Sequence, residues 1–387
     1  MSEHRLLMIP GPIELEPSVL AAMAAPARSH VDPDFVRVMG RVLTSLRAVM
    51  LAPSAQPFVI AGSGTLAMEI AVANLIEPED GAVVVETGWF SERMAKILQR
   101  LGANVVRVTA PPGTVPDPDA IARAIAEVRP RLVTITHVDT STGVHIDPAP
   151  IAALAREVGA LVVLDAVCSA AGEPIRQHAW GLDVVLTGSQ KALGAPPGLA
   201  VLTFSEAAIA RRRARSRPPA SLYLDVLEWL PIMEAYEAGK PMYFATPAVS
   251  LVCALDASLL AILDEGMEAR FARHARVATA FRAAFEAMGL EMLPAEPSLC
   301  ASTMSAVRYP EGVGGELVDA MRDEGVMIAG GLHPAIKASY FRVGHMGSTG
   351  PAELMTTVGA LERALRRCGH RVDPGVGVTA AARVLAP

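Results

Sequence analysis

Short apolar runs alternate with helically spaced segments over the first half of the chain. Helical spacing occurs in residues 66–75, 91–100, 119–128 and 149–158. Between and around them lie runs rich in β-branched residues, at 57–61, 82–86, 104–109, 131–136, 161–165, 183–187 and 199–204. Strands joined by crossover helices are typical of a largely parallel sheet. The pattern therefore predicts an α/β fold with a mostly parallel seven-stranded sheet, in which ligands bind outside the carboxyl ends of the strands.

The pattern is different on both sides of this region. Residues 1–20 are interrupted by Pro10-Gly11-Pro12 and predict an N-terminal arm without regular structure. Helical spacing over 35–50 predicts a helix before the first strand. Residues 218–247 show only short helical stretches and predict a hinge, and an apolar helix follows over 248–263.

The C-terminal part predicts a second, smaller α+β domain. A helix from residue 271 is followed by strand candidates at 303–308, 326–329 and 340–343 and by a helix over 351–367. The tail after His370 is rich in alanine and valine and has no assignment. We therefore expect three parts, an arm (1–20), a large domain (21–263) and a small C-terminal domain (264–387).

Composition and charge exclude several classes of partner. Hydrophobic residues make up 51% of the 387 residues, and the mean hydropathy is +0.35. The longest apolar stretch, 248–263, is broken by Asp256, so we predict no membrane span. A net charge of −6 gives no electrostatic reason to expect nucleic acid, and the basic run at 211–217 is interpreted as a solvated helix face.

The cysteines and the termini indicate a compartment. Cys168, Cys253, Cys300 and Cys368 are widely spaced, which fits reduced thiols better than a disulfide scaffold. Neither a His-Glu-x-x-His nor a Cys-x-x-Cys pattern occurs, so we predict no metal site. The first residues lack the pattern of a secretory signal and the last residues lack a peroxisomal signal. We expect a cytoplasmic protein.

Lys191 follows a predicted strand and lies in a loop of small residues and prolines. Of the 34 Lys and Arg residues only four are lysines, namely Lys96, Lys191, Lys240 and Lys337. Arginine can replace lysine where only charge matters, but its guanidinium does not deprotonate and forms no Schiff base. Lys191 is therefore either a nucleophile or a structural lysine that binds loop carbonyls, and this stretch alone does not distinguish the two.

Three other strands also end in polar or glycine-rich sequence. Gly62-Ser63-Gly64-Thr65 precedes a helix, which suits a phosphate but also an ordinary turn. Residues 137–143 carry several hydroxyls that either bind a ligand or cap the loop. Asp165 ends an apolar strand and needs a partner there, because an unpaired buried charge is costly.

These four features together match what pyridoxal phosphate requires. The lysine would form a Schiff base with the cofactor, the aspartate would pair with the protonated pyridine nitrogen, and the loop amides would hold the phosphate. A charge-assisted hydrogen bond to the ring nitrogen is worth about 1.5 to 3 kcal/mol, enough to keep the ring protonated.

From about Leu7 to Gly350 the chain also resembles a known family, the class V aminotransferases of fold-type I, and within it the fungal-type alanine:glyoxylate aminotransferases. The motifs that carry this resemblance are Ile9-Pro10-Gly11-Pro12-Ile13, Gln56-Pro57-Phe58-Val59, Ala61-Gly62-Ser63-Gly64-Thr65, Thr136-His137-Val138-Asp139-Thr140-Ser141-Thr142, Val163-Leu164-Asp165-Ala166-Val167-Cys168-Ser169, Ser189-Gln190-Lys191-Ala192, Tyr236-Glu237-Ala238-Gly239-Lys240, Tyr243-Phe244-Ala245-Thr246-Pro247 and Arg342-Val343-Gly344-His345-Met346-Gly347. The sequence departs from the family at Thr65, where animal relatives tend to have histidine, and at Gly143, where the fungal pattern has alanine.

The resemblance implies a role for individual residues. Lys191 would carry the cofactor and Asp165 would bind its pyridine nitrogen, while Trp89 and Val167 would cover the two faces of the ring. Thr140 would bind the ring hydroxyl, and Arg342 would bind the substrate carboxylate through a bidentate fork. The phosphate would be held by Ser63, Gly64, Thr65 and Gln190, joined by Tyr243 and Thr246 from the second subunit of a homodimer.

The resemblance further implies transamination between small-molecule amino acids and 2-oxo acids, from L-alanine to glyoxylate, with Lys191 moving the α-proton. Serine:glyoxylate, serine:pyruvate and ureidoglycine:glyoxylate transfer use the same residues and stay open. A lyase or cysteine desulfurase would need a reactive thiol, for which Cys300 is the obvious candidate. A non-catalytic regulatory module would need an interaction domain, which the sequence does not suggest. His345 is either a structural histidine or a proton carrier.

Overall fold

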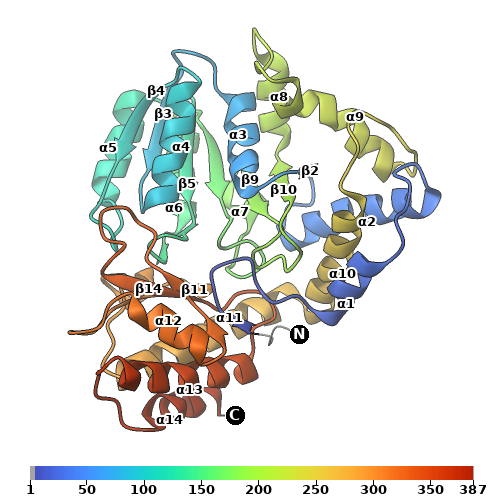
Figure 1. Cartoon of the computed structure of the whole chain (residues 1–387). Helices are drawn as coiled ribbons and strands as arrows, with labels where there is room; N and C mark the ends of the chain where they lie inside the picture. Colours follow the sequence, from blue (N-terminus) through green and yellow to red (C-terminus); the bar gives the residue numbers. More distant parts are fainter. Residues whose placement is uncertain (1–4, 387) are drawn as a thin grey trace.

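A seven-stranded sheet forms the centre of the larger part of the molecule (Figure 1). The structure is a computed structural model that describes residues 5–386. The strand order is β2-β10-β9-β8-β5-β3-β4, and every neighbouring pair is parallel except the two that involve β10. The strands are β2 (Gln56–Ala61), β3 (Gly81–Val85), β4 (Asn104–Val108), β5 (Leu132–Thr136), β8 (Leu161–Asp165), β9 (Val184–Gly188) and β10 (Leu199–Phe204). The predicted mostly parallel sheet is confirmed.

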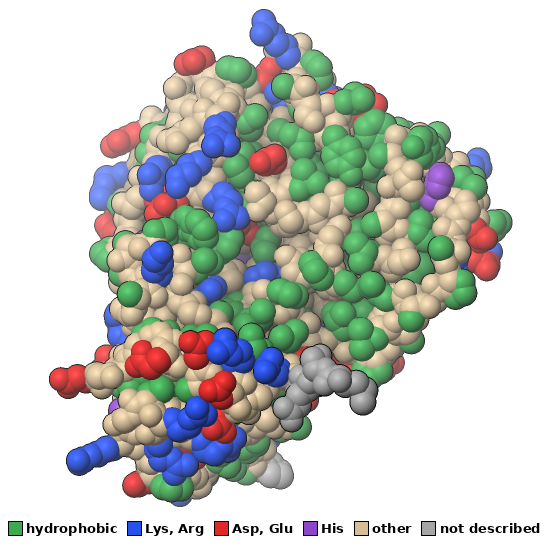
Figure 2. Space-filling model, in the orientation of Figure 1, with side chains coloured by type: hydrophobic (Ala, Val, Ile, Leu, Met, Phe, Trp, Pro, Cys, Tyr) green, Lys and Arg blue, Asp and Glu red, His purple; other side chains and the backbone are tan. Residues whose placement is uncertain are grey.

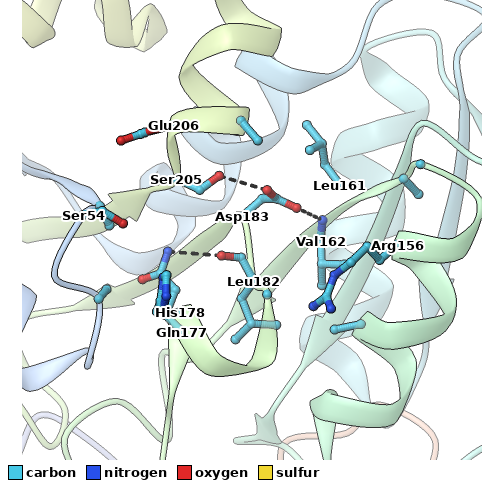
Figure 3. A pocket seen from close by; sticks show the side chains of 17 residues that line it. Ser54, Arg156, Leu161, Val162, Gln177, His178, Leu182, Asp183, Ser205 and Glu206 are labelled. Carbon is cyan, nitrogen blue, oxygen red and sulfur yellow. Dashed lines mark hydrogen bonds between the residues drawn. The ribbon is translucent and has the colours of Figure 1, made fainter.

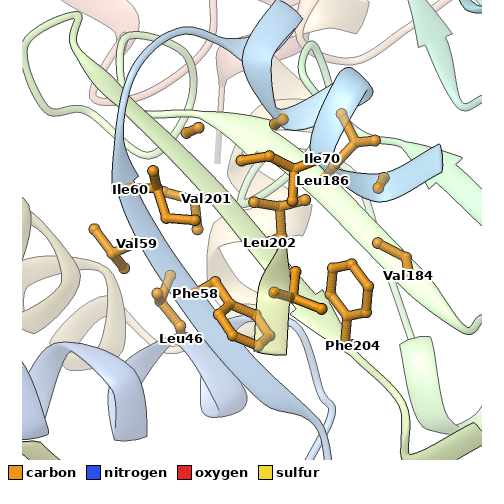
Figure 4. Packing of buried hydrophobic residues seen from close by; sticks show 14 of the residues in the cluster. Leu46, Phe58, Val59, Ile60, Ile70, Val184, Leu186, Val201, Leu202 and Phe204 are labelled. Atoms are coloured by element: carbon orange, nitrogen blue, oxygen red, sulfur yellow. The ribbon is translucent and has the colours of Figure 1, made fainter. Parts of the chain in front are cut away.

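Two apolar clusters cover the two faces of this sheet. On one face Phe58, Leu202 and Phe204 pack with residues of the helices (Figure 4), and the rings of Phe58 and Phe204 meet edge to face at 5.4 Å. On the other face Val85, Ile135 and Leu164 form a second cluster. Six of these strands are largely buried and mostly apolar, whereas the edge strand β4 is mostly exposed and was located by its β-branched residues.

The helices before, between and after these strands agree with the prediction in position at residues 35–50, 66–75, 91–100, 119–128 and 149–158, whereas the helix after β8 has no predicted counterpart and the helix after β10 is indicated only by the basic run at 211–217. They are α2 (Pro33–Val49), α3 (Gly64–Leu75), α4 (Trp89–Arg100), α5 (Pro118–Val128), α6 (Pro148–Glu157), α7 (Gln177–Trp180) and α8 (Glu206–Ala214). Short strands β6 (Val138–Asp139) and β7 (Val144–His145) pair with each other after β5. Aspartates 32, 117 and 147 accept a hydrogen bond from the first turn of α2, α5 and α6, each followed by a proline that suits the first helical position.

The segment between α8 and the C-terminal part is more regular than the sequence indicates. It contains η1 (Leu222–Leu224), α9 (Val226–Glu237) and α10 (Val249–Glu265). Pro231 lies inside α9, and a proline within a helix removes a backbone donor, so the sequence favoured a hinge where the structure has a three-turn helix. Asp225 caps α9 and also receives two hydrogen bonds from Arg212, and these contacts fix the start of the helix.

The C-terminal part packs helices against a small antiparallel sheet of order β11-β14-β13. Its elements are α11 (Met267–Ala287), η2 (Pro297–Leu299), β11 (Met304–Arg308), α12 (Glu316–Asp323), β12 (Val326–Met327), β13 (Ala329–Gly330), β14 (Tyr340–Gly344), α13 (Pro351–Arg367) and α14 (Val376–Leu385). The unassigned tail forms α14, which packs on α11 and α13 at the bottom of Figure 1. We propose that the arm, the large domain and the small domain are divided at residues 20 and 263.

The N-terminal segment crosses from one part of the molecule to the other. Its strand β1 (Leu6–Leu7) pairs in parallel with β12, and helix α1 (Pro17–Ala24) packs on α10. Between these elements Pro10 and Gly11 pass next to Lys191. The expectation that residues 1–20 have no regular structure is wrong for residues 6–7, whose strand is supplied by the distant β12, and for residues 17–20, which begin α1.

A cavity of about 560 Å³ lies at the amino ends of the central strands (Figure 3). Asp183 lines it and accepts hydrogen bonds from the backbone N–H of Val162 at 2.8 Å and from the hydroxyl of Ser205 at 2.9 Å. Gln177 also donates a hydrogen bond within its wall, to the carbonyl oxygen of Leu182, and the cavity lies at the edge of the sheet opposite to the predicted site. Over residues 5–386 no helix is both long and apolar enough to cross a membrane.

Candidate active site

Most of the predicted site residues follow the carboxyl ends of the central strands. Ser63, Gly64 and Thr65 follow β2, Trp89 follows β3, Thr140 follows β5 and β6, Val167 follows Asp165 at the end of β8, and Gln190 and Lys191 follow β9. Pairing in register sets Thr136 beside Asp165 and Asp165 beside Leu186, so the ends of β5, β8 and β9 are level. The loops therefore open at one edge of the sheet, as the architecture predicts.

The Lys191 side chain is 7% exposed and lies under the N-terminal segment. Its Nζ donates a hydrogen bond to the carbonyl oxygen of Pro10. A Cβ added to Gly11 would lie 2.6 Å from Cδ of Lys191, so only glycine allows the backbone this close. Burial, with the charge of Arg342 as a smaller cause, lowers the pKa of the Lys191 amine. A neutral amine is thus accessible at lower pH than for a lysine in water.

Asp165 is 3% exposed, and its Oδ1 accepts one hydrogen bond, from the backbone N–H of Val167 at 2.9 Å. Burial raises the pKa of this carboxyl from 3.8 to about 7, although the Val167 hydrogen bond and the charge of Lys191 act in the opposite direction. A buried carboxylate with so little compensation is stabilised by a cationic hydrogen-bond donor. Such a donor is what a protonated pyridine nitrogen provides.

The loops after β2 and β9 touch each other. A Cβ added to Gly188 would lie 3.3 Å from the backbone nitrogen of Gly64 and 2.8 Å from Oε1 of Gln190. A Cβ added to Gly64 would lie 2.9 Å from Cγ2 of Val167. Oε1 of Gln190 is buried without a hydrogen-bond partner in the described chain. In this polar cradle the backbone N–H of Gly64 at the start of α3 and the side-chain amide N–H of Gln190 can donate to a phosphate, whereas Oε1 can only accept a hydrogen bond.

Trp89 begins α4 and is held by a network from the loop after β5. Its backbone N–H donates to Oγ of Ser141 at 2.9 Å. Asp139 accepts hydrogen bonds from the backbone N–H groups of Phe90 at 3.0 Å and Ser91 at 3.3 Å. A carboxylate at a helix N-terminus satisfies free N–H groups and favours the helix dipole. The sequence analysis gave Asp139 no role, although a carboxylate next to the hydroxyl cluster could have indicated one.

Arg342 reaches the site from β14 of the C-terminal sheet. Its Nε donates to the carbonyl oxygen of Gly330 at 2.9 Å and its Nη1 to that of Thr140 at 3.0 Å. The side chain is 8% exposed, and no carboxylate pairs with it in the described part of the chain. Two carbonyls orient the guanidinium and leave the remaining donors for a ligand. A buried, uncompensated arginine suits a carboxylate.

Tyr243 and Thr246 lie elsewhere, in the exposed segment between α9 and α10. The Tyr243 ring is 62% exposed and lies 5.3 Å from the ring of His30. Within residues 5–386 neither side chain makes a hydrogen bond or ring contact with another predicted site residue. A single chain therefore does not bring these two residues to the other members of the predicted set.

His345 is enclosed within the C-terminal part. Its Nε2 lies 3.0 Å from Oγ of Ser305, its Nδ1 lies 3.1 Å from the carbonyl oxygen of Ser302, and its ring stacks on Phe281 at 5.0 Å. Burial lowers the pKa of His345 to about 3. Both nitrogens are occupied and the ring stays neutral near pH 7, which favours the structural interpretation over proton transfer.

These observations fit the pyridoxal phosphate that the resemblance implies. Asp165 needs a cationic donor, Gln190 and the amide of Gly64 offer a polar cradle, and Lys191 is buried with a lowered pKa. The three features follow β8, β9 and β2 of one sheet, with β10 between the last two. The residues present therefore match a ligand with a basic ring nitrogen, a phosphate and a carbonyl carbon that reacts with an amine.

Known proteins resemble this chain along nearly its whole length. The sequence profile of the family described as Aminotransferase class-V matches residues 20–349. Alanine–glyoxylate aminotransferase 1 of Saccharomyces cerevisiae is 38% identical over 357 residues, covering 89% of this chain and 92% of that protein. L-aspartate–glyoxylate aminotransferase of Paracoccus denitrificans is 32% identical over 388 residues, covering 98% and 96%. The crystal structure of ureidoglycine-glyoxylate aminotransferase from Bacillus subtilis matches with a TM-score of 0.93 at 30% identity, covering 100% of this chain and 99% of that one.

Proposed function

We propose that this chain, which belongs to the class V aminotransferase family, transfers the amino group of L-alanine to glyoxylate and so forms pyruvate and glycine. Pyridoxal phosphate is its cofactor, as in the fold-type I aminotransferases whose fold it shares. The observation that carries the proposal is the convergence of buried Lys191, Asp165 and Arg342 at one edge of the sheet. A transaminase needs an amine, a ring-nitrogen partner and a carboxylate receptor in that arrangement.

In this proposal each residue that binds the cofactor acts through the chemistry of its own side chain. Asp165 accepts a hydrogen bond from the protonated ring nitrogen. Trp89 and Val167 cover the two faces of the ring, and Thr140 binds the ring hydroxyl. The phosphate is held by Ser63, Gly64, Thr65 and Gln190. When bound, pyridoxal phosphate withdraws electrons from the substrate α-carbon and carries the amino group between the two half-reactions.

The remaining steps belong to Arg342 and Lys191. Arg342 binds the substrate carboxylate with the donors that its two carbonyl contacts leave free, and this fixes the direction of the α-carbon–hydrogen bond. Lys191 takes the α-proton at Nζ and later returns it, which requires a neutral amine. The lowered pKa of Lys191 supports that role, because burial favours the uncharged form.

The choice of acceptor has broader support than the choice of donor. Proteins named for transfer to glyoxylate with alanine, aspartate or ureidoglycine as donor all align over most of this chain. Glyoxylate is common to them, and the amino donor is not. We favour L-alanine because the chain is 38% identical to the Saccharomyces cerevisiae protein named for alanine, whereas the proteins named for aspartate and ureidoglycine, and three other proteins named for alanine, are 30–32% identical.

A homodimer is part of the proposal. Hydrophobic side chains gather over α9 and the segment that follows it (Figure 2), where Met242 is 46% and Tyr243 62% exposed. Contiguous exposed apolar surface is typical of protein–protein contact. A second copy that covers this segment would deliver Tyr243 and Thr246 to its phosphate cradle. We also propose a cytoplasmic location, supported by four cysteines that are all unpaired.

The test is a half-reaction on purified protein. The visible absorbance of the bound cofactor is followed while L-alanine, L-serine, L-aspartate and (S)-ureidoglycine are added in separate samples, and glyoxylate or pyruvate is then added. Loss of the band with alanine and its return with glyoxylate is the expected result. A band that responds to another donor alone would replace alanine in the proposal, and a band that persists with every donor would contradict transamination.

Cys300 distinguishes the proposal from a cysteine-dependent lyase. Burial raises the pKa of its thiol, and Sγ lies 3.7 Å from the carbonyl oxygen of Glu296. A reactive cysteine needs a lowered pKa, so we expect Cys300→Ala to keep the rate of alanine:glyoxylate transfer within about twofold of wild type. Steady-state kinetics of the variant, with Cys253→Ala as the control, would expose a catalytic thiol as a large loss of rate.

A further inference from the structure

Arg93 of α4 joins two segments that the proposed function assigns to the cofactor. Its Nη1 donates a hydrogen bond to Oγ1 of Thr65 at 2.9 Å. Its guanidinium carbon lies 5.0 Å from the centroid of the Trp89 ring and 4.7 Å from that of Phe90. One side chain therefore holds both the first turn of α3 and the aromatic residue that begins α4.

The charge of Arg93 is not neutralised within residues 5–386, where no carboxylate forms an ion pair with it. Figure 2 shows Lys and Arg side chains gathered over α4, and Arg93, Lys96 and Arg100 line a cavity of about 410 Å³ that Thr65 also lines. The residues proposed to hold the phosphate, from Ser63 to Thr65 and Gln190, include no cation. Arg93 supplies a positive charge that contacts one of these residues directly.

We propose that Arg93 is a positioning residue for the cofactor phosphate. By donating to Oγ1 of Thr65, it occupies a lone pair of that hydroxyl and leaves the hydroxyl proton for the phosphate. Its charge polarises the same hydroxyl and makes it a stronger donor. Through the cation–π contact it also fixes the orientation of Trp89. This inference rests on the proposed assignment of Thr65 and Trp89 to the cofactor.

Lysine cannot reproduce this arrangement. A guanidinium is planar, so it lies flat on a ring while its edge donates to a hydroxyl. An ammonium group keeps the charge but has no plane to stack. Arg93→Lys therefore separates the electrostatic part of the role from the geometric part, whereas Arg93→Gln removes both.

The test compares two ligands, pyridoxal phosphate and pyridoxal, which share the ring and differ in the phosphate. Dissociation constants for both are measured on cofactor-free wild type, Arg93→Gln, Arg93→Lys, Thr65→Val and the Gln/Val double variant. Lys96→Gln, which lines the same cavity and is exposed, is the control for loss of charge on α4. Thermal unfolding of each cofactor-free protein shows whether it is folded. If Arg93→Gln does not fold, Arg93→Lys takes its place in the comparison.

We expect Arg93→Gln to raise the dissociation constant of pyridoxal phosphate by about tenfold or more and that of pyridoxal by much less. The dissociation constant of pyridoxal phosphate for Arg93→Lys should lie between those for wild type and Arg93→Gln. The double variant should bind pyridoxal phosphate more tightly than the sum of the two single effects predicts, because Arg93 acts in part through the Thr65 hydroxyl. Equal weakening of both ligands, no weakening of either, or additive effects of the two substitutions would overturn the inference. If wild type binds neither ligand, or binds both but fails the alanine half-reaction, the fault lies in the proposed function instead.

Discussion

Lys191, Asp165 and Arg342 each lose nearly all contact with water, and burial acts on their charges in different ways. It lowers the pKa of the lysine and raises that of the aspartate, so both move toward their neutral forms. The arginine keeps its charge, because a guanidinium does not deprotonate in proteins. Without the cofactor these three side chains therefore lack partners that compensate their charges, which is characteristic of sites that bind a charged ligand.

Replacing Lys191 tests the main catalytic assignment. We expect Lys191→Ala to reduce turnover by at least about a thousandfold, because the variant has no amine to move the α-proton. The same change removes a buried amine, so thermal stability should not fall much. Turnover and the unfolding midpoint are measured together, with Lys337→Ala as the exposed control. Near-normal turnover of Lys191→Ala would contradict the assignment.

Asp165 should make the cofactor-free protein less stable as pH rises. Its folded-state pKa of about 7 lies above the unfolded value, so between about pH 4 and 7 the folded state holds the extra proton and stability falls with increasing pH. Asp165→Asn lacks this titration. We expect its free energy of unfolding, relative to wild type, to rise by about 3 kcal/mol between pH 5 and pH 8.

Denaturant unfolding of the cofactor-free proteins at the two pH values measures this difference. Asp264→Asn, at an exposed position, is the control for the change in net charge. A constant difference between Asp165→Asn and wild type would mean that the carboxyl is already ionised at pH 5. With pyridoxal phosphate bound the sign should reverse, since the carboxylate then has a cationic partner and Asp165→Asn binds the cofactor more weakly.

At the scale of elements, the sequence located what is buried on both sides and missed what depends on distant partners. Six of the seven central strands are buried and mostly apolar, and the exposed edge strand β4 is rich in valine, so all seven were recognised in nearly their observed positions. Helix α9 was missed because Pro231 interrupts it, and α14 because its alanine-rich sequence carries little pattern before it packs on α11. Strand β1 exists only through β12, which no local signal reveals.

The site residues divide in the same way, into those that local sequence indicates and those that depend on distant partners. Residues directly after a strand, such as Asp165 and Lys191, were predicted from strand ends. Arg342 was one arginine among many until the resemblance identified it, since its selection depends on the carbonyls of Gly330 and Thr140. Arg93 was missed entirely, because its contact with Thr65 arises from the packing of α4 beside α3, and its contact with Trp89 lies within α4, where an arginine four residues from an aromatic residue is an ordinary pattern.

Gly11 tests the N-terminal segment as an element of the site. Its φ is +86°, and a Cβ there would lie 2.6 Å from Cδ of Lys191. We expect Gly11→Ala to lower turnover by about tenfold or more, because the methyl group displaces the lysine. Gly312→Ala has a similar φ of +79° but no atom within 4 Å, so it controls for backbone strain. Equal turnover of the two variants would contradict a role of the N-terminal segment in the site.

At the scale of the whole molecule, shared sites make a prediction about mixed dimers. If Tyr243 serves the site of the second subunit, Lys191→Ala and Tyr243→Ala damage complementary halves of each site. Unfolding the two variants together and refolding them should produce heterodimers with one intact site each. Random pairing then restores about a quarter of wild-type activity from two nearly inactive proteins. Activity and sedimentation of the mixture are measured, and no recovery despite dimer formation would show that Tyr243 serves its own chain.

The parallel pairing of β1 with β12 has a consequence for the synthesis of the chain. Leu6 and Leu7 leave the ribosome first, yet Val326 and Met327 emerge only after the whole large sheet has been translated. Domains fold as units during translation, so the sheet and Lys191 can be in place while Pro10 and Gly11 still have no anchor. A nascent chain stalled before residue 326 would therefore display an uncovered lysine, open to carbonyl compounds in the cell, and translation of the C-terminal part would close it.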